Sequence, residues 1–349
     1  MPWFNDNIER MAAYVPGEQT AETDVVKLNT NENAYPPSPR VLQALAEFDP
    51  EMLRRYPDAM ARRFREAAAK VLDVDADWIL PGNGSDDLIM MIARACTGPG
   101  RRMAYPTPTF TFYRTQADIE NAPAVEVPFD EDFSLPLEEL AEANAAVTFV
   151  ANPNSPSGTA VPVEQLDELA ERLDGLLVID EAYIEFSEPR FVSLKLALER
   201  ENVIVLRTLS KGYSLAGLRL GFAVARPELL AGLLKTKAIY NVGAVPCLAG
   251  AAAMEEQDHK NANARKICED RAKLSERLER MGFRVWPSQA NFLMVRPPEG
   301  DAERIYRELK DRRVLVRYFA AAATADKLRF AVGTEPENDR LLEALGEVV

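Results

Sequence analysis

The chain has 349 residues, and 47% of them are hydrophobic, which is enough for two domains or for one large and one small domain. Its 55 acidic residues outnumber its 41 basic ones, and the net charge of −14 argues against nucleic acid or anionic lipid as a partner. Three separated cysteines without a CxxC pair argue against a disulfide framework or a zinc site. One histidine, His259, lies in a polar stretch, which excludes Ser–His–Asp and Cys–His catalysis.

The first residues, MPWFNDNIER, lack the basic segment and the apolar core of a signal peptide. No apolar run reaches the roughly 18 residues that are needed to cross a bilayer. We therefore expect a cytoplasmic protein that has no membrane partner.

The N-terminal third is predicted to hold an arm, two helices and a strand–turn–helix unit. Residues 1–40 are rich in proline and asparagine, which predicts an extended arm that closes over a site. The stretches 41–48 and 60–71 have the spacing of amphipathic helices. A short strand, a glycine-rich turn and a helix follow in WILPGNGSDDLIMMIARAC. Asp86 and Asp87 fall in the first turn of that helix, where negative charge is favourable.

The central part of the chain alternates apolar runs with helical patterns such as 163–173. Continuous apolar strands separated by helices predict a mainly parallel sheet that is covered on both faces. A further strand is expected in LRLGFAVAR. The four apolar runs are 102–105, 146–151, 176–179 and 203–206.

The C-terminal part is predicted to form a smaller α+β domain after a long helical region at 231–281. Strands are expected in FRVWP, NFLMVRP, VLVRYF and KLRFAVG, with a helix in DAERIYRELKDR. We expect residues 1–40 to belong with this small domain, residues 41–245 to form the large domain, and residues 246–349 to form the small one.

Polar stretches follow four of the predicted strands, namely PGNGSDD, NPNSPSG, DEAY and RTLSK. Ligands of an open α/β sheet bind at the carboxyl ends of its strands, so these stretches should meet in one crevice. Lys211 lies in the last of them. A lysine in such a crevice either binds a phosphate or forms a Schiff base with a carbonyl.

Pyridoxal 5′-phosphate needs a lysine that forms a Schiff base. It also needs a carboxylate at its ring nitrogen, a donor to its ring oxygen and a phosphate site, and the polar stretches offer these groups. Asp180 would pair with the ring nitrogen and keep it protonated, and Tyr183 would donate to the ring oxygen. The phosphate needs helix N-terminal amides, which GNGSDD supplies, and polar or cationic side chains such as Ser210 and Arg219.

Each of these side chains also has a purely structural interpretation. Lys211 could be a surface lysine, Asp180 a helix N-cap, Tyr183 a packing residue and Arg219 a salt-bridge partner. Their combination at one predicted sheet edge favours the cofactor interpretation.

The pair of IDEAY and, 31 residues after Asp180, the lysine of TLSKGYSLAGLRLGF resembles the fold-type I aminotransferases. Stretches over nearly the whole chain are most similar to histidinol-phosphate aminotransferases and their near relatives, including AYVPG, KLNTNENAYPPSP, RRYPD, GNGSDDLI, PTFTFY, NPNSPSG, VLVRYF and KLRFAVGT. The resemblance implies an α/β large domain with a seven-stranded, mainly parallel sheet, a smaller α+β domain, pyridoxal phosphate, and a homodimer.

The resemblance also implies a role for individual residues around the cofactor. Lys211 would form the covalent link and then shuttle a proton, Asp180 would pair with the ring nitrogen, and Tyr183 would bond the ring oxygen. The phosphate would lie beside Gly84, Ser85, Asp86, Ser210 and Arg219.

Further residues are assigned to ring stacking and to the substrate. Phe110 would stack on the ring, and Tyr56 would reach the phosphate of the neighbouring subunit's cofactor. Arg329, with Arg317 beside it, would bind the anionic end of the substrate. An arginine among apolar strand residues is costly unless it meets an anion. Tyr14 would contact the substrate, across the dimer. For Tyr14 and Tyr56 a packing role is the open alternative.

One stretch departs from the family pattern. Relatives often read PNNPTG, where the asparagine before proline bonds the ring oxygen, but this chain has Ser155 at that position and Asn154 before it. Either Asn154 takes this role from a shifted backbone, or Tyr183 holds the oxygen alone.

The resemblance implies a transaminase that takes an amino donor and a 2-oxo acid, with L-histidinol phosphate and 2-oxoglutarate as the expected pair in histidine biosynthesis. An aromatic amino acid aminotransferase is the first alternative, and turnover with phenylalanine would reveal it. A decarboxylase of a phosphorylated amino acid is the second, and CO₂ release without a 2-oxo acid would reveal it. A regulator without catalysis would need a basic DNA-binding helix, which the acidic chain does not show.

Overall fold

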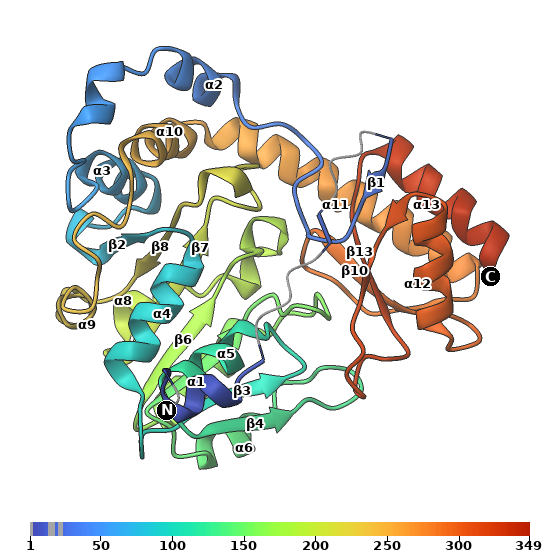
Figure 1. The fold of residues 1–349 in the computed structure, drawn as a ribbon, viewed down its shortest axis with the longest axis horizontal. Helices are drawn as coiled ribbons and strands as arrows, with labels where there is room; N and C mark the ends of the chain where they lie inside the picture. Colours follow the sequence, from blue (N-terminus) through green and yellow to red (C-terminus); the bar gives the residue numbers. More distant parts are fainter. Residues whose placement is uncertain (1–2, 13–17, 20–23) are drawn as a thin grey trace.

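The large sheet has seven strands in the order β2-β8-β7-β6-β5-β3-β4, which confirms the predicted fold class. The computed structural model describes all residues except 1–2, 13–17 and 20–23 (Figure 1). The strands run parallel apart from β8, which is antiparallel to both β2 and β7. Their bounds are Ile79–Gly82 (β2), Met103–Thr107 (β3), Ala124–Pro128 (β4), Val147–Ala151 (β5), Leu176–Asp180 (β6), Val203–Thr208 (β7) and Gly221–Val224 (β8).

Both faces of this sheet are covered by helices, which is why its central strands are largely apolar. Successive residues of a strand point to opposite faces, so Ile179 and Val205 join one core while Val178 and Ile204 join the other. Helices on the first face include α3 (Arg62–Leu72), α7 (Val163–Arg172) and α10 (Ala244–Glu255), and those on the second include α4 (Ser85–Cys96), α5 (Phe112–Ile119) and α9 (Pro227–Leu233).

A smaller body follows the sheet domain in the chain and lies beside it in Figure 1. Its antiparallel sheet has the order β12-β13-β10-β9, and a separate pair joins β1 to β11. Residues of α11, α12 and α13 pack with these strands into one core. The bounds are Val26–Lys27 (β1), Arg284–Val285 (β9), Phe292–Arg296 (β10), Val314–Leu315 (β11), Arg317–Tyr318 (β12), Leu328–Ala331 (β13), Gln257–Arg280 (α11), Ala302–Asp311 (α12) and Glu335–Val348 (α13).

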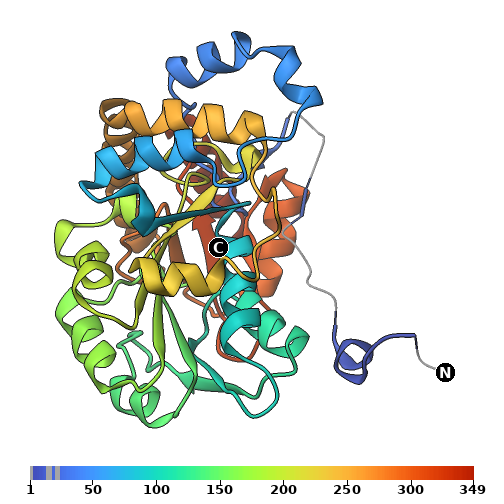
Figure 2. The ribbon, with the colours of Figure 1, turned by 90° about the vertical axis from the view of Figure 1, so that its left-hand side faces the viewer.

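The N-terminal part contacts both bodies. β1 pairs with β11 of the smaller body, whereas Asn7 of α1 (Asp6–Arg10) donates from its amide to the carbonyls of Asp118 and Ile119 on α5. The helix α2 (Pro39–Ala46) packs over α10, which in turn packs on α3 (Figure 2). Two short helices complete the large body, α6 (Leu137–Glu142) and α8 (Leu194–Glu199).

The predicted helical region 231–281 is interrupted at 234–243, and this part of the prediction is wrong. Within the break, the ammonium group of Lys237 donates to the backbone carbonyls of Ala238 and Ile239 at 2.8 Å each, so these carbonyls have a partner outside a helix. The predicted domain boundary at 245/246 falls inside α10. Ala249 and Met254 of that helix pack in the same core as Phe64 of the large body.

Among the described residues, no helix combines the length and the apolar character needed to cross a membrane.

Candidate active site

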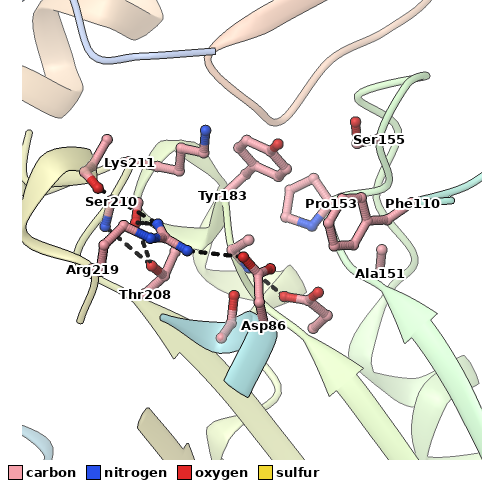
Figure 3. Close-up of a pocket in the computed structure, with 14 residues that line it drawn as sticks. Asp86, Phe110, Ala151, Pro153, Ser155, Tyr183, Thr208, Ser210, Lys211 and Arg219 are labelled. Carbon is pink, nitrogen blue, oxygen red and sulfur yellow. Dashed lines mark hydrogen bonds and ion pairs between the residues drawn. The ribbon is translucent and has the colours of Figure 1, made fainter. Parts of the chain in front are cut away.

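Two neighbouring cavities lie at the carboxyl ends of the central strands. The first has a volume of about 200 Å³ and contains residues that follow β2, β5, β6 and β7. Figure 3 shows Arg219 and Lys211 on one side of it, Phe110 and Ser155 on the other, and Asp86 and Tyr183 between them. The second cavity, about 280 Å³, shares four lining residues with the first, which are Phe110, Ser155, Tyr183 and Lys211.

Lys211 lies in the wall that the two cavities share, just beyond the end of β7. Its Nζ donates a hydrogen bond to the backbone carbonyl of Thr30 at 3.1 Å and lies 5.8 Å from the centre of the Tyr183 ring. The backbone carbonyl of Lys211 accepts from the Asn33 amide at 2.9 Å. The amine is therefore held between both cavities, where it can reach a group in either one.

Asp180 is the last residue of β6, and only 4% of its surface is exposed. Tyr113 Oη donates to its Oδ2 at 2.9 Å, and the backbone N–H of Ala182 donates to its Oδ1 at 3.2 Å. Burial raises the pKa of this carboxyl group to about 6, although the hydrogen bond from Tyr113 acts in the opposite direction. No cation of the described residues forms an ion pair with Asp180, so the cavity offers a buried carboxylate to a positively charged ligand group.

A candidate anion site lies at the N-terminus of α4. Arg219 reaches it from a left-handed backbone conformation (φ 53°), and its Nη2 bonds Asp86 Oδ2 at 2.8 Å. Ser210 Oγ accepts from Thr208 Oγ1 at 2.9 Å beside it. Gly84 has a φ of 78°, a conformation that favours glycine, and a Cβ atom there would lie 2.6 Å from Arg219 Nη2 and displace the guanidinium. Helix amides, a hydroxyl group and a guanidinium group together suit a phosphate.

The NPNSPSG loop turns Ser155, and not Asn154, toward the cavities. The Asn154 amide is buried within the loop, where it accepts from Thr109 Oγ1 at 2.7 Å and donates to Ser157 Oγ at 2.9 Å. Ser155 lines both cavities, and its Oγ accepts from Arg329 Nη1 at 2.9 Å. The predicted contact between Asn154 and the cofactor would require Asn154 to leave these partners.

Two arginines on neighbouring strands line the second cavity. Arg317 of β12 stands opposite Arg329 of β13 in the antiparallel register. Arg329 is 8% exposed, and its Nη2 donates to the backbone carbonyl of Asn29 at 2.9 Å. Both guanidinium groups lie near the ring of Phe319, at 5.1 and 5.4 Å from its centre. This cavity therefore presents two positive charges to an anionic group.

Comparison with known proteins agrees with this geometry. The model of the family "Aminotransferase class I and II" matches residues 23–345. The chain belongs to this family. Histidinol-phosphate aminotransferase 1 of Trichormus variabilis is 51% identical over 348 residues, which cover 99% of both chains. The corresponding enzyme of Citrifermentans bemidjiense is 43% identical over 346 residues, 99% of this chain and 98% of the other.

A solved structure extends the comparison. Histidinol-phosphate aminotransferase from Sinorhizobium meliloti, in complex with pyridoxal-5′-phosphate, has a TM-score of 0.93 to this aminotransferase. It is 26% identical and covers 100% of this chain and 98% of the other.

The remaining predicted residues lie in different places in the aminotransferase. Phe110 lines both cavities, and its ring meets that of Tyr113 edge-on at 5.7 Å. Tyr56 lines neither cavity. It is 81% exposed and stacks on Tyr240 at 4.5 Å between ring centres. Tyr14 lies outside the described residues.

Several residues of the site were not predicted, and three of them hold predicted ones. Tyr113 holds Asp180, Thr208 bonds Ser210, and Asn31 donates from Nδ2 to Tyr183 Oη at 3.1 Å. Tyr113 is the last residue of PTFTFY and lies three residues after Phe110. This spacing could have predicted a second aromatic residue at the site.

Proposed function

We propose that the aminotransferase transfers the amino group of L-histidinol phosphate to 2-oxoglutarate, in histidine biosynthesis, with pyridoxal phosphate as its cofactor. One observation carries the proposal. Lys211 lies between a cavity that has an anion site and a buried carboxylate and a second cavity that has two arginines. The relatives that share up to 51% identity over the whole chain bear the name of this activity.

The residues of the first cavity fit pyridoxal phosphate group by group. The N-terminus of α4, Ser210 and Arg219 would hold the phosphate, and Asp180 would take the protonated ring nitrogen. Asp180 is the most specific part of this fit, because a buried carboxylate without a cation is otherwise unfavourable. Phe110 would cover the ring, and Tyr183 would face its oxygen.

The residues of the chain then divide the chemistry among them. When bound, the cofactor supplies a carbonyl group that reacts with amines and a ring that withdraws electrons from the carbon beside the nitrogen. Lys211 Nζ can take a proton from that carbon of the substrate and return it on the cofactor side, because the amine borders both cavities. Asp180 keeps a negative charge at the ring nitrogen, which favours its protonated form.

Arg329 and Arg317 would bind the anionic end of each substrate in turn. L-Histidinol phosphate has no carboxylate, so its phosphate group would meet the two guanidinium groups. The carboxylate of 2-oxoglutarate would use the same cations in the second half of the reaction. Ser155 Oγ, 2.9 Å from Arg329 Nη1, holds that guanidinium in place.

Initial rates with three donors test this proposal. With 2-oxoglutarate as acceptor, we expect kcat/KM for L-histidinol phosphate to exceed that for phenylalanine by at least about 100-fold, because the phosphate group brings nearly two negative charges to the two arginines, whereas phenylalanine brings only its single carboxylate. Equal or higher kcat/KM with phenylalanine would identify an aromatic amino acid aminotransferase. Release of CO₂ from threonine phosphate without a 2-oxo acid would identify a decarboxylase.

Replacement of Arg219 by glutamine is expected to weaken the binding of pyridoxal phosphate by about 10- to 100-fold, the usual loss for one charge-assisted hydrogen bond. The dissociation constant is measured by absorbance titration of the cofactor-free protein. Arg94→Gln is the matched control, because Arg94 lies at the other end of α4 and is paired with Glu120 on the surface. Equal affinity of both variants would contradict the assignment of the phosphate site.

A homodimer is part of the proposal, because Tyr56 lines neither cavity of its own subunit. Tyr56, Tyr240 and Ile239 form an exposed apolar group that is 81%, 43% and 72% accessible. Such a group suits a contact with a second subunit, where Tyr56 would reach the phosphate of the partner.

Mixing of two impaired variants tests this arrangement. If Tyr56 acts across the interface, then Lys211→Ala and Tyr56→Ala subunits that are unfolded and refolded together should regain about a quarter of the wild-type activity. Half of the random dimers would then hold one intact site of two. Activity that stays at the sum of the two separate variants would place Tyr56 outside the partner's site.

A further inference from the structure

The segment 28–33, which reads LNTNEN, connects the smaller body with the lysine loop. Leu28 is bonded through its backbone to Leu315 at 2.8 Å and to Ala331 at 2.9 Å, both in the smaller body. Five residues later, the Asn33 amide donates to the backbone carbonyl of Lys211 at 2.9 Å. The segment is thus anchored at both ends, and the side chains between its ends have fixed positions at the second cavity.

Asn31 is the most constrained residue of this segment. It is 1% exposed and lies in the left-handed region (φ 54°), which asparagine tolerates better than most residues. The Asn291 amide donates to its backbone carbonyl at 3.0 Å, and its own Nδ2 donates to Tyr183 Oη at 3.1 Å. Its Oδ1 makes no hydrogen bond with the residues that the structure describes.

This contact determines the role that the Tyr183 hydroxyl can play. A phenol oxygen that accepts a hydrogen bond still has its own proton to donate. Asn31 Oδ1 does not take that proton, and the Tyr183 ring is fixed edge-on against Phe292 at 5.0 Å between centres. Because Tyr183 lines both cavities, the proton remains available to an acceptor there.

We propose that Asn31 is a positioning residue that makes Tyr183 a hydrogen-bond donor toward the ring oxygen of pyridoxal phosphate. The inference rests on the proposed function, because that oxygen belongs to the proposed cofactor. A donor stabilises the anionic form of the oxygen, so it lowers the pKa at which the absorbance of the bound cofactor changes. The charged groups that line the same cavities are Asp86, Asp180, Lys211, Arg219, Arg317 and Arg329, and all of them stay unchanged in the test.

The test is an absorbance titration with pH of the cofactor-loaded protein in four variants. Tyr183→Phe should raise the measured pKa by about one unit, the usual effect of one hydrogen bond to a charged group. Asn31→Asp keeps the shape but accepts the Tyr183 proton, so it should raise the pKa at least as much. Asn31→Gly removes the side chain without backbone strain at positive φ, and its upward shift should be smaller. In the double variant Asn31→Gly, Tyr183→Phe, the pKa should equal that of Tyr183→Phe alone.

Asn144→Gly is the matched control, because Asn144 is exposed and has a similar φ of 47°. If Asn31→Gly and Asn31→Asp titrate like this control, Asn31 has only a structural role and the inference is overturned. The inference is also overturned if Tyr183→Phe causes no shift of the pKa. The same holds if Asn31→Gly raises the pKa as much in the protein that already carries Tyr183→Phe as it does in the wild type.

Thermal unfolding of the cofactor-free variants identifies folded protein, and Asn31→Asp keeps the test decisive if Asn31→Gly does not fold. Wild-type protein that takes up no pyridoxal phosphate would overturn the proposed function itself.

Discussion

Replacement of Lys211 by alanine is expected to lower the rate of transamination by about 10⁴-fold or more. The variant loses the amine that links to the cofactor and also the group that moves the proton, and general acid–base catalysis alone contributes up to about 10⁴-fold. Among the described residues that line the two cavities, Lys211 is the one lysine, so no neighbour can replace it. The measurement is the initial rate with L-histidinol phosphate and 2-oxoglutarate at saturating cofactor.

Two further variants separate chemistry from charge. Lys211→Arg keeps the positive charge but cannot form the covalent link, so we expect it to be as inactive as Lys211→Ala. Lys195→Ala, which removes an exposed lysine paired with Glu199, should keep the wild-type rate. A Lys211→Ala protein that keeps more than a tenth of the wild-type rate would contradict the assigned role.

Replacement of Asp180 by asparagine is expected to have two opposite effects, one on activity and one on stability. Activity should fall by at least about 100-fold, because an amide cannot supply the negative charge that keeps the ring nitrogen protonated. The exposed Asp174→Asn is the control and should keep its activity.

The effect of Asp180→Asn on the stability of the cofactor-free protein has the opposite sign. Burial raises the pKa of Asp180 to about 6 from an ordinary 3.8, so the folded state binds this proton more tightly than the unfolded state. The free energy of unfolding therefore falls as the pH rises from about 4 to 6, by about 3 kcal/mol at 1.36 kcal/mol per unit. The variant should lack this loss and be more stable than the wild type above pH 6.

Urea unfolding of the cofactor-free proteins at several pH values between 4.5 and 7.5 measures this difference. The gain of Asp180→Asn over the wild type should grow up to about pH 6 and level off above it. Because other groups titrate equally in both proteins, the difference isolates Asp180. If the variant is less stable than the wild type at pH 7.5, the Asp180 carboxylate does not lower the free energy of unfolding of the cofactor-free protein, and the prediction is wrong.

The strands and the first residues of the site could be predicted because local patterns determine them. Apolar runs predicted β5, β6 and β7 to within two residues. Asp180 directly follows one such run, and Lys211 comes five residues after the end of another. Parallel strands bring their carboxyl ends together, so the sequence was sufficient to place both residues at one edge of the sheet.

Other features of the site depend on contacts that the sequence does not reveal. Whether Asn154 or Ser155 faces the cavity depends on the turn geometry of the loop and on Thr109, which is 45 residues away. The contacts of Tyr113 with Asp180 and of Asn31 with Tyr183 join residues 67 and 152 positions apart. In the break at 234–243, Lys237 bonds the carbonyls of Ala238 and Ile239, and helical periodicity does not reveal these contacts.

A half-reaction without acceptor can show whether the two cavities serve one cofactor and two alternating substrates. The cofactor-loaded protein is mixed with L-histidinol phosphate alone, and its absorbance is followed before and after 2-oxoglutarate is added. If the cavities do, L-histidinol phosphate in excess over the subunits should change the cofactor spectrum completely, and 2-oxoglutarate should restore it. A spectrum that histidinol phosphate leaves unchanged, while another amino donor changes it and 2-oxoglutarate restores it, would contradict the account.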